Sequence, residues 1–414
     1  MKFTLPLLCA AALALATPAS AQLKPVTREE IAIGSQQYLP SQQTQGGPYL
    51  RDAALQAYVD RIGQRLAKAS EFPDLPYEFT VINNGELNAW ALPGGKIAVN
   101  RGLLLVMEDE AQLAAVLAHE ISHVTRRHAM RMRKKSQTVG VIGALAGLAI
   151  GSKAPQYSDL AMKGAGLAVY GTQANYSRDH ELQADSVGMK LMSAAGYDPM
   201  AAVEIQQIFL QQSQGRSGGG LQALFASHPP SQARVDANRK RLAQLPAGGE
   251  RGKPAYAAAT AKLRADKPAF DALQEAVAAY GKADFATALS RSERAIALQP
   301  KEGLAWEMKG QSQFKLGRKS DSLAAFDKAV TLSPGFFRPV LLRGLVHQDL
   351  GKLTEAENDL LASRKILPTQ IAAYQLGEIS RQRGRRDAAI GYYREAAQGG
   401  GEIGEAAKRR LLEL

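Results

Sequence analysis

The sequence predicts two domains, a mostly helical α+β domain with a small sheet and, after it, an all-α superhelix of helical repeats. Three observations lead to this prediction. Two extended segments, 77–82 and 90–100, stand among long stretches of helical periodicity in the first half. From Pro300 onward, prolines recur every 34 residues. A chain of 414 residues is also longer than most single domains.

The first 21 residues indicate an export signal. Lys2 precedes an apolar stretch, 5–16, and small residues at 19–21 form a cleavage site, so we expect a mature periplasmic protein that begins at Gln22. The one cysteine, Cys9, lies in this segment, which leaves the mature chain without disulfide or thiolate chemistry.

The chain is basic, with 51 Lys and Arg against 39 Asp and Glu. These residues are spread along the sequence and no nucleic-acid-binding motif accompanies them, so we expect no nucleic-acid partner. We interpret the positive charge mainly as a contribution to solubility.

The elements of the first domain follow one another in a simple order. Helical periodicity covers 22–68 with a polar break at 41–48, and a strand is expected at 77–82. After a turn at 83–85, an extended segment, a tight turn at 93–95 and a second strand at 96–100 are expected. Apolar positions then recur at helical spacing from 108 to 135, which predicts one continuing helix.

Residues 137–152 carry no formal charge, and Gly143, Gly147 and Gly151 are spaced by four. The stretch is shorter than the roughly 18 apolar residues of a spanning helix. It follows a basic run, which favours an anionic membrane surface. A lid or packed helix is the preferred interpretation of 137–171, and peripheral membrane contact is the alternative.

A glycine-rich segment at 245–254 marks the domain boundary. We expect the first domain at 22–245, a linker at 246–267 and the repeat domain at 268–414, with about four repeats and a capping helix. Small residues at fixed offsets let the two helices of each unit approach closely, and the proline ends the second helix. The 34-residue pattern resembles the tetratricopeptide repeat, whose concave surface binds peptides or proteins.

The segment Ala118-His119-Glu120-Ile121-Ser122-His123 indicates a metal site. His119 and His123 are four positions apart on a helix, so their imidazoles project from one face and can share an ion. Glu120 lies beside them, where it can take a proton from water as a general base. Two solvated histidines are the much weaker alternative.

A zinc site of the catalytic kind needs a third protein ligand. The best candidate is Glu181, because Glu181 and Asp185 lie four apart on one helical face. Asp185 would then accept a hydrogen bond from a ligand imidazole and fix its tautomer.

These motifs together resemble the M48 family of zinc metallopeptidases. The resemblance covers about 27–241 and is carried by NAWALPGG, VLAHEISHVTRRHA, SRDHELQAD and His228-Pro229-Pro230 with Arg234 following. It implies a zincin-type (gluzincin) endopeptidase fold and one Zn²⁺ per chain, held by His119, His123 and Glu181, with Glu120 as general base.

Together with the repeats, the chain resembles periplasmic members of this family that act in outer-membrane protein quality control. That resemblance implies unfolded or misassembled outer-membrane proteins and their assembly machinery as partners, with chaperone-like activity. The alternative is a repeat-mediated chaperone or adaptor whose zinc site is latent.

The resemblance also places His228 near the zinc. It would either stabilise the oxyanion of the intermediate or occupy the fourth zinc position and keep the enzyme latent. Asp185 and Arg234 are expected behind the ligands. His128 and His180 should project away from the metal if their helices are continuous, with a packing or supporting role for His128.

The extended segment around Asn88, Ala89 and Trp90 would offer a strand edge to a substrate in β conformation. Trp90 would line a side-chain pocket or, equally well, belong to the core.

Overall fold

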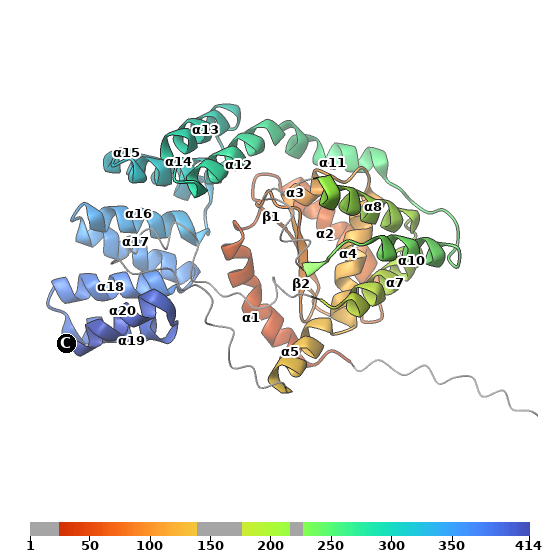
Figure 1. Cartoon of the computed structure of the whole chain (residues 1–414), viewed down its shortest axis with the longest axis horizontal. Coiled ribbons are helices and arrows are strands. Elements are labelled where there is room, and N and C mark those ends of the chain that lie inside the picture. Colours follow the sequence, from red (N-terminus) through yellow and green to blue (C-terminus); the bar gives the residue numbers. More distant parts are fainter. Residues whose placement is uncertain (1–24, 139–175, 216–226) are drawn as a thin grey trace, which may run out of the picture.

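A computed structural model of the chain describes residues 25–138, 176–215 and 227–414 (Figure 1). The predicted export signal and nearly all of 137–171 lie outside these ranges. The first domain contains the elements α1 (Arg28–Thr44), α2 (Ala53–Lys68), β1 (Glu78–Ile82), β2 (Ala89–Leu92), β3 (Lys96–Asn100), α3 (Arg101–Leu104), α4 (Glu110–Thr125), α5 (His128–Thr138), α7 (Arg178–Ala194), α8 (Met200–Gly215), α10 (Gln232–Leu242) and α11 (Lys253–Ala265).

The sheet has the strand order β1-β3-β2, with β1 parallel and β2 antiparallel to β3. Gly94 and Gly95 form the predicted tight turn between β2 and β3 with φ of 78° and 92°, values that side chains disfavour. Chain segment 47–49 covers the outer edge of β1, where the Tyr49 amide donates to the Val81 carbonyl at 2.8 Å. Among the described residues, no strand pairs with the outer edge of β2.

Helix α4 runs through the centre of this domain and packs against α2, α7, α8 and the sheet. Asp109 immediately precedes it, and the Asp109 side chain accepts from the Gln112 amide and so caps the helix. Leu113, Leu117 and Ile121 are fully buried. Each such side chain stabilises the fold by about 1.5–3 kcal/mol, so α4 is a rigid support for whatever it carries.

The prediction of one continuing helix over 108–135 was wrong. Helix α4 ends at Thr125, and Arg127 has a left-handed backbone with φ of 56° before α5 begins at His128. The guanidinium of Arg127 donates to the buried carboxylate of Glu30 in α1, with Nε 2.8 Å from Oε1. This ion pair, of a buried carboxylate and a partly exposed guanidinium, stabilises a backbone conformation that cannot be predicted from helical periodicity.

The second domain consists of stacked helix pairs, as the period predicts (Figure 1). The pairs are α12 (Lys267–Gly281) with α13 (Phe285–Leu298), α14 (Gly303–Lys315) with α15 (Lys319–Leu332), α16 (Phe337–Asp349) with α17 (Leu353–Ile366), and α18 (Gln370–Gln382) with α19 (Arg386–Gln398), capped by α20 (Gly401–Leu412). Gly310 shows why small residues recur, since a Cβ there would lie 2.9 Å from the ring of Phe326.

The segment expected to be a linker, 246–267, folds onto the first domain. It contains α11, whose Tyr256 and Leu263 are fully buried in the core of that domain. The Tyr256 hydroxyl donates to the Leu104 carbonyl at 2.7 Å. Just before α11, Arg251 Nε donates to Asp109 at the start of α4 at 2.9 Å. The glycine-rich sequence therefore marks a tethered connection.

The two domains also meet directly. Phe270 of α12 lies in the core of the first domain, with the Arg101 guanidinium 3.6 Å from its ring centroid. Asn83 donates to the buried carboxylate of Glu302 at 2.9 Å. Helix α1 lies between the sheet and the repeats (Figure 1). Its Gln43 side chain donates to the Gly335 carbonyl and accepts from the Phe337 amide.

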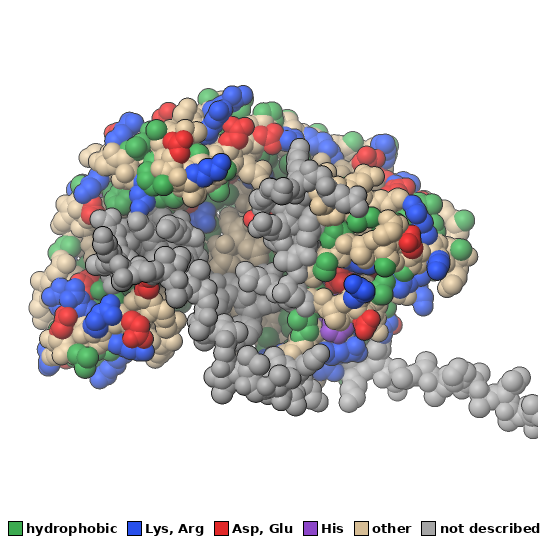
Figure 2. All heavy atoms as spheres, in the orientation of Figure 1, with side chains coloured by type: hydrophobic (Ala, Val, Ile, Leu, Met, Phe, Trp, Pro, Cys, Tyr) green, Lys and Arg blue, Asp and Glu red, His purple; other side chains and the backbone are tan. Residues whose placement is uncertain are grey.

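On the face shown in Figure 2, basic and acidic side chains are interspersed over the described repeats. The excess positive charge does not gather into one patch on this face. Within the described ranges, no helix combines the length and apolar character needed to cross a bilayer.

Candidate metal centre

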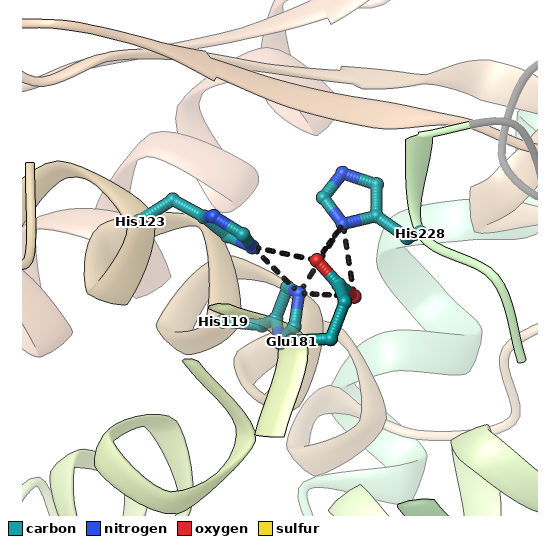
Figure 3. Close-up of side chains that lie close together, drawn as sticks. All are labelled: His119, His123, Glu181 and His228. Carbon is teal, nitrogen blue, oxygen red and sulfur yellow. Dashed lines mark hydrogen bonds and ion pairs between the residues drawn. The ribbon is translucent and has the colours of Figure 1, made fainter. Parts of the chain in front are cut away.

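Four side chains from three parts of the chain point toward one another (Figure 3). Helix α4 supplies His119 and His123, α7 supplies Glu181, and the segment just before α10 supplies His228. One ligand atom from each lies within 4.8 Å of all the others. The structure thus brings together the three expected ligands and His228.

The distances between these atoms suit a small metal ion. His119 Nε2 is 3.0 Å from His123 Nε2, 3.4 Å from His228 Nδ1 and 3.4 Å from Glu181 Oε2. Glu181 Oε1 is 3.3 Å from His123 Nε2 and 3.1 Å from His228 Nδ1. Tetrahedral zinc with bonds of about 2.0–2.2 Å separates its ligand atoms by about 3.4 Å. Two to three imidazoles and a carboxylate at this spacing fit zinc.

Close packing of α7 against α4 places Glu181. The Ser177 hydroxyl caps α7 by accepting from the His180 amide at 3.3 Å. Gly188 faces α4, where even a Cβ would lie 3.2 Å from the His119 backbone nitrogen. The absent side chain lets the two helices approach until Glu181 reaches the histidines.

The charges around the cluster favour a cation. Burial would lower the pKa of His119, but the carboxylates of Glu181 and Asp185 outweigh it and raise that pKa to about 10. Burial opposes ionisation of Glu181, yet the nearby His228 and His119 hold its pKa well below the usual range. Burial lowers the pKa of His123 well below its ordinary value, so this ring is neutral and has a lone pair to donate to a metal.

Glu120 is buried beside the cluster, and its Oε1 lies 3.7 Å from His228 Nε2. No group in the described part of the chain hydrogen-bonds to its Oε2. Burial raises the pKa of Glu120, although His228 and His119 partly offset this. A carboxylate with a raised pKa and a free oxygen is suited to take up and return a proton.

Asp185 and Arg234 lie behind the ligands. Asp185 Oδ1 is 3.0 Å from His119 Nδ1, and Arg234 holds both oxygens of Asp185 at 2.7 and 2.8 Å. Arg234 Nη1 also lies 2.8 Å from Glu181 Oε2 and donates to the Pro229 carbonyl at 3.3 Å. Arg234 therefore links α7 to the segment that carries His228 and balances two buried carboxylates.

Two aromatic side chains contact the His123 ring. The Tyr176 ring lies 3.9 Å from the His123 ring centroid, and His128 Nδ1 lies 3.0 Å from His123 Nδ1. The contact with His123 agrees with the packing or supporting role expected for His128, and His128 is not one of the four clustered residues. Its expected position on the far side of one continuing helix was wrong, because the chain reverses at Arg127. His180 stands outside the cluster and stacks on His128 at 4.4 Å. No sequence motif marked Tyr176.

A pocket adjoins His119, Glu120 and His228, with mostly apolar walls that include Ala89 and Val116. The backbone of β2 thus comes close to the cluster. The Asn88 carbonyl accepts from the Asn100 amide at 2.9 Å. Trp90 belongs to the core, because its ring packs on Tyr38 and its indole nitrogen donates to Gln45 at 3.1 Å.

Comparison with known proteins matches this half of the chain to one family. The model "Peptidase family M48" matches residues 53–242, which include every residue of the cluster, and the tetratricopeptide repeat model matches 273–335 and 341–403. "Metalloprotease YcaL" of Escherichia coli (strain K12) is 31% identical over 192 residues, which are 44% of this chain and 71% of that protein. The chain belongs to peptidase family M48.

Longer M48 relatives share part of their length with it. The "Beta-barrel assembly-enhancing protease" of Escherichia coli (strain K12) is 30% identical over 220 residues, 52% of this chain and 44% of that protein. A "Putative beta-barrel assembly-enhancing protease" of Vibrio cholerae is 31% identical over 264 residues, 59% of this chain and 54% of the relative. The chain thus spans about half the length of these M48 relatives.

Proposed function

We propose that the protein is a periplasmic zinc endopeptidase that acts in the quality control and assembly of outer-membrane β-barrel proteins. The observation that carries this proposal is the cluster of His119, His123, Glu181 and His228 with Glu120 beside it. A structural zinc site gains nothing from a buried carboxylate with a free oxygen next to the ligands. The names of the longer relatives support the cellular role.

His119, His123 and Glu181 would hold the zinc. Bound there, zinc would polarise the scissile carbonyl and lower the pKa of the attacking water, so that the water could lose a proton near neutral pH. Glu120 accepts the proton of the attacking water and passes it to the leaving amine. Asp185 orients the His119 ring, and Arg234 keeps Asp185 and Glu181 ionised.

His228 supports a latent resting state. Its Nδ1 lies among the ligand atoms, 3.1 Å from Glu181 Oε1 and 3.4 Å from His119 Nε2. Catalytic zinc needs one open position, and His228 in its present place would fill that position. Activity then requires His228 to leave, after which the same imidazole can donate to the developing oxyanion.

The outer edge of β2, with which no strand pairs among the described residues, supports clients in β conformation. The opposite edge of the sheet is covered by 47–49, and Ala89 on β2 lines the pocket next to Glu120. An extended peptide that pairs with β2 would present its backbone to the cluster. Pairing through the backbone suits unfolded or misassembled β-strands of varied sequence.

The repeats would bind the clients or the assembly machinery, and they supply the second candidate function. A chaperone or adaptor with a silent zinc site is favoured by the position of His228 among the ligand atoms. The two candidates differ in whether cellular function depends on proteolysis.

The test compares the mature wild-type chain with Glu120→Gln and His228→Ala. We expect about one zinc per chain in all three, chelator-sensitive cleavage of an unfolded substrate such as casein by the wild type, none by Glu120→Gln and faster cleavage by His228→Ala. Zinc-free protein, or cleavage that resists chelators, would refute the enzyme. Full complementation by Glu120→Gln in cells would favour the chaperone function.

A further inference from the structure

We propose that His128 is a positioning residue that fixes the tautomer and ring orientation of His123 toward the metal. The inference rests on the proposed zinc function. It concerns a residue outside the motif His-Glu-x-x-His. It follows from which nitrogen of each imidazole must carry the proton for the observed contacts to be hydrogen bonds.

The first step is the tautomer of His123. Its Nε2 faces the cluster, 3.3 Å from Glu181 Oε1 and 3.0 Å from His119 Nε2. An imidazole binds a metal through a nitrogen that carries no proton, so the proton of His123 must be on Nδ1. This nitrogen lies 3.0 Å from His128 Nδ1, which must then act as the acceptor.

The second step is the tautomer of His128. If Nδ1 accepts, its own proton is on Nε2, and this nitrogen lies 2.9 Å from Gln183 Oε1. The Arg131 guanidinium donates to the same Gln183 oxygen at 3.5 Å, which agrees with an acceptor there. The chain of hydrogen bonds is therefore consistent: His123 Nδ1 donates to His128 Nδ1, and His128 Nε2 donates to Gln183 Oε1.

The surroundings hold the His128 ring in place. It is fully buried, the His180 ring stacks on it at 4.4 Å, and Tyr176 covers His123 at 3.9 Å. The left-handed Arg127, paired with Glu30, turns the chain so that His128 faces back toward α4. Without that reversal, the ring would lie on the far side of a longer helix.

An imidazole suits this place better than a carboxylate. His119 is already supported by Asp185, whose charge is balanced by Arg234. The site also contains Glu120 and Glu181, so another buried carboxylate would lack a cation and would be costly. A neutral imidazole accepts the proton of His123 without adding charge.

The test measures zinc affinity in three variants of the full mature chain by competition with a chelator. His128→Leu removes the acceptor, and we expect zinc to bind about 10- to 100-fold more weakly. His128→Asn keeps an oxygen near the position of Nδ1 and should lose less. His347→Leu, a histidine in the repeat helix α16, is the matched control and should bind zinc like the wild type.

Two results would overturn the inference. The first is that His128→Leu binds zinc as tightly as the wild type does, which would refute the role of His128 but not the proposed zinc enzyme. If the wild type itself bound no zinc, both proposals would be refuted. The second comes from the zinc-loaded wild type, so it does not depend on the folding of a variant. Long-range proton–nitrogen NMR should find the His128 proton on Nε2, and a proton on Nδ1 would contradict the inference.

Discussion

The contact of Phe270 with the first domain yields a prediction whose size follows from the structure. The Phe270 side chain is 3% exposed, its ring meets Tyr49 edge-on at 6.4 Å, and the Arg101 guanidinium lies 3.6 Å above it. Replacing a buried Phe by Ala costs about 3–5 kcal/mol. A desolvated cation–π contact accounts for about 2 kcal/mol of such a loss. Phe270→Ala should therefore lower the free energy of unfolding by about 3–5 kcal/mol.

The assay is urea unfolding of the mature chain, followed by circular dichroism. Val277→Ala is the matched control, because Val277 lies on the same helix and is 50% exposed, and its loss should stay within about 0.5 kcal/mol. We also expect Phe270→Ala to separate the unfolding of the two domains. A loss below about 1 kcal/mol with unchanged cooperativity would refute the view that this side chain joins the domains.

Three further predictions concern the site, the packing and pH. Asp185→Asn removes the charge beside His119, 3.0 Å away, and should weaken zinc binding about 10- to 100-fold in chelator competition; unchanged affinity would contradict this role. Gly34→Ala should cost about 1–3 kcal/mol in urea unfolding, because its Cβ would lie 1.7 Å from the Pro93 carbonyl oxygen, whereas Gly391→Ala, with nothing within 4 Å, should stabilise its helix by up to about 1 kcal/mol. Burial lowers the pKa of His128 to about 4, so protonation in the unfolded state should destabilise metal-free protein as the pH falls from about 6.5 toward 4. Urea titrations between about pH 6.5 and 4 should show that the free energy of unfolding of the metal-free wild type falls more steeply as the pH is lowered than that of His128→Asn, by up to about 1.4 kcal/mol per pH unit. Equal slopes would contradict the lowered pKa of His128.

Local patterns in the sequence were sufficient for much of this architecture. The spacing of His119 and His123 places both on one face of a helix whatever surrounds them. The glycines and prolines of the repeats act within one helix pair, and Gly94 and Gly95, whose φ is positive, mark the tight turn in the sequence itself. These features are determined by residues a few positions apart.

Contacts between distant residues could not be predicted in this way. The reversal at Arg127 depends on Glu30, which precedes it by 97 positions. Periodicity alone continued the helix, and His128 was consequently placed on the wrong side. The segment 246–267 looked like a linker because its glycines are local signals, whereas the burial of Tyr256 depends on packing against the first domain.

Helix α1 has a mechanical consequence. Near its end, Gln43 Nε2 donates to the Gly335 carbonyl and Gln43 Oε1 accepts from the Phe337 amide, both at 2.9 Å. Near its start, Glu30 bonds Arg127, the residue before His128. A helix of 17 residues is about 26 Å long, so α1 connects the start of α16, in the third helix pair, to the turn at Arg127 between α4 and α5. A load that displaces this repeat must either break the hydrogen bonds of Gln43 or act, through Glu30, on Arg127, which immediately precedes His128 and helix α5.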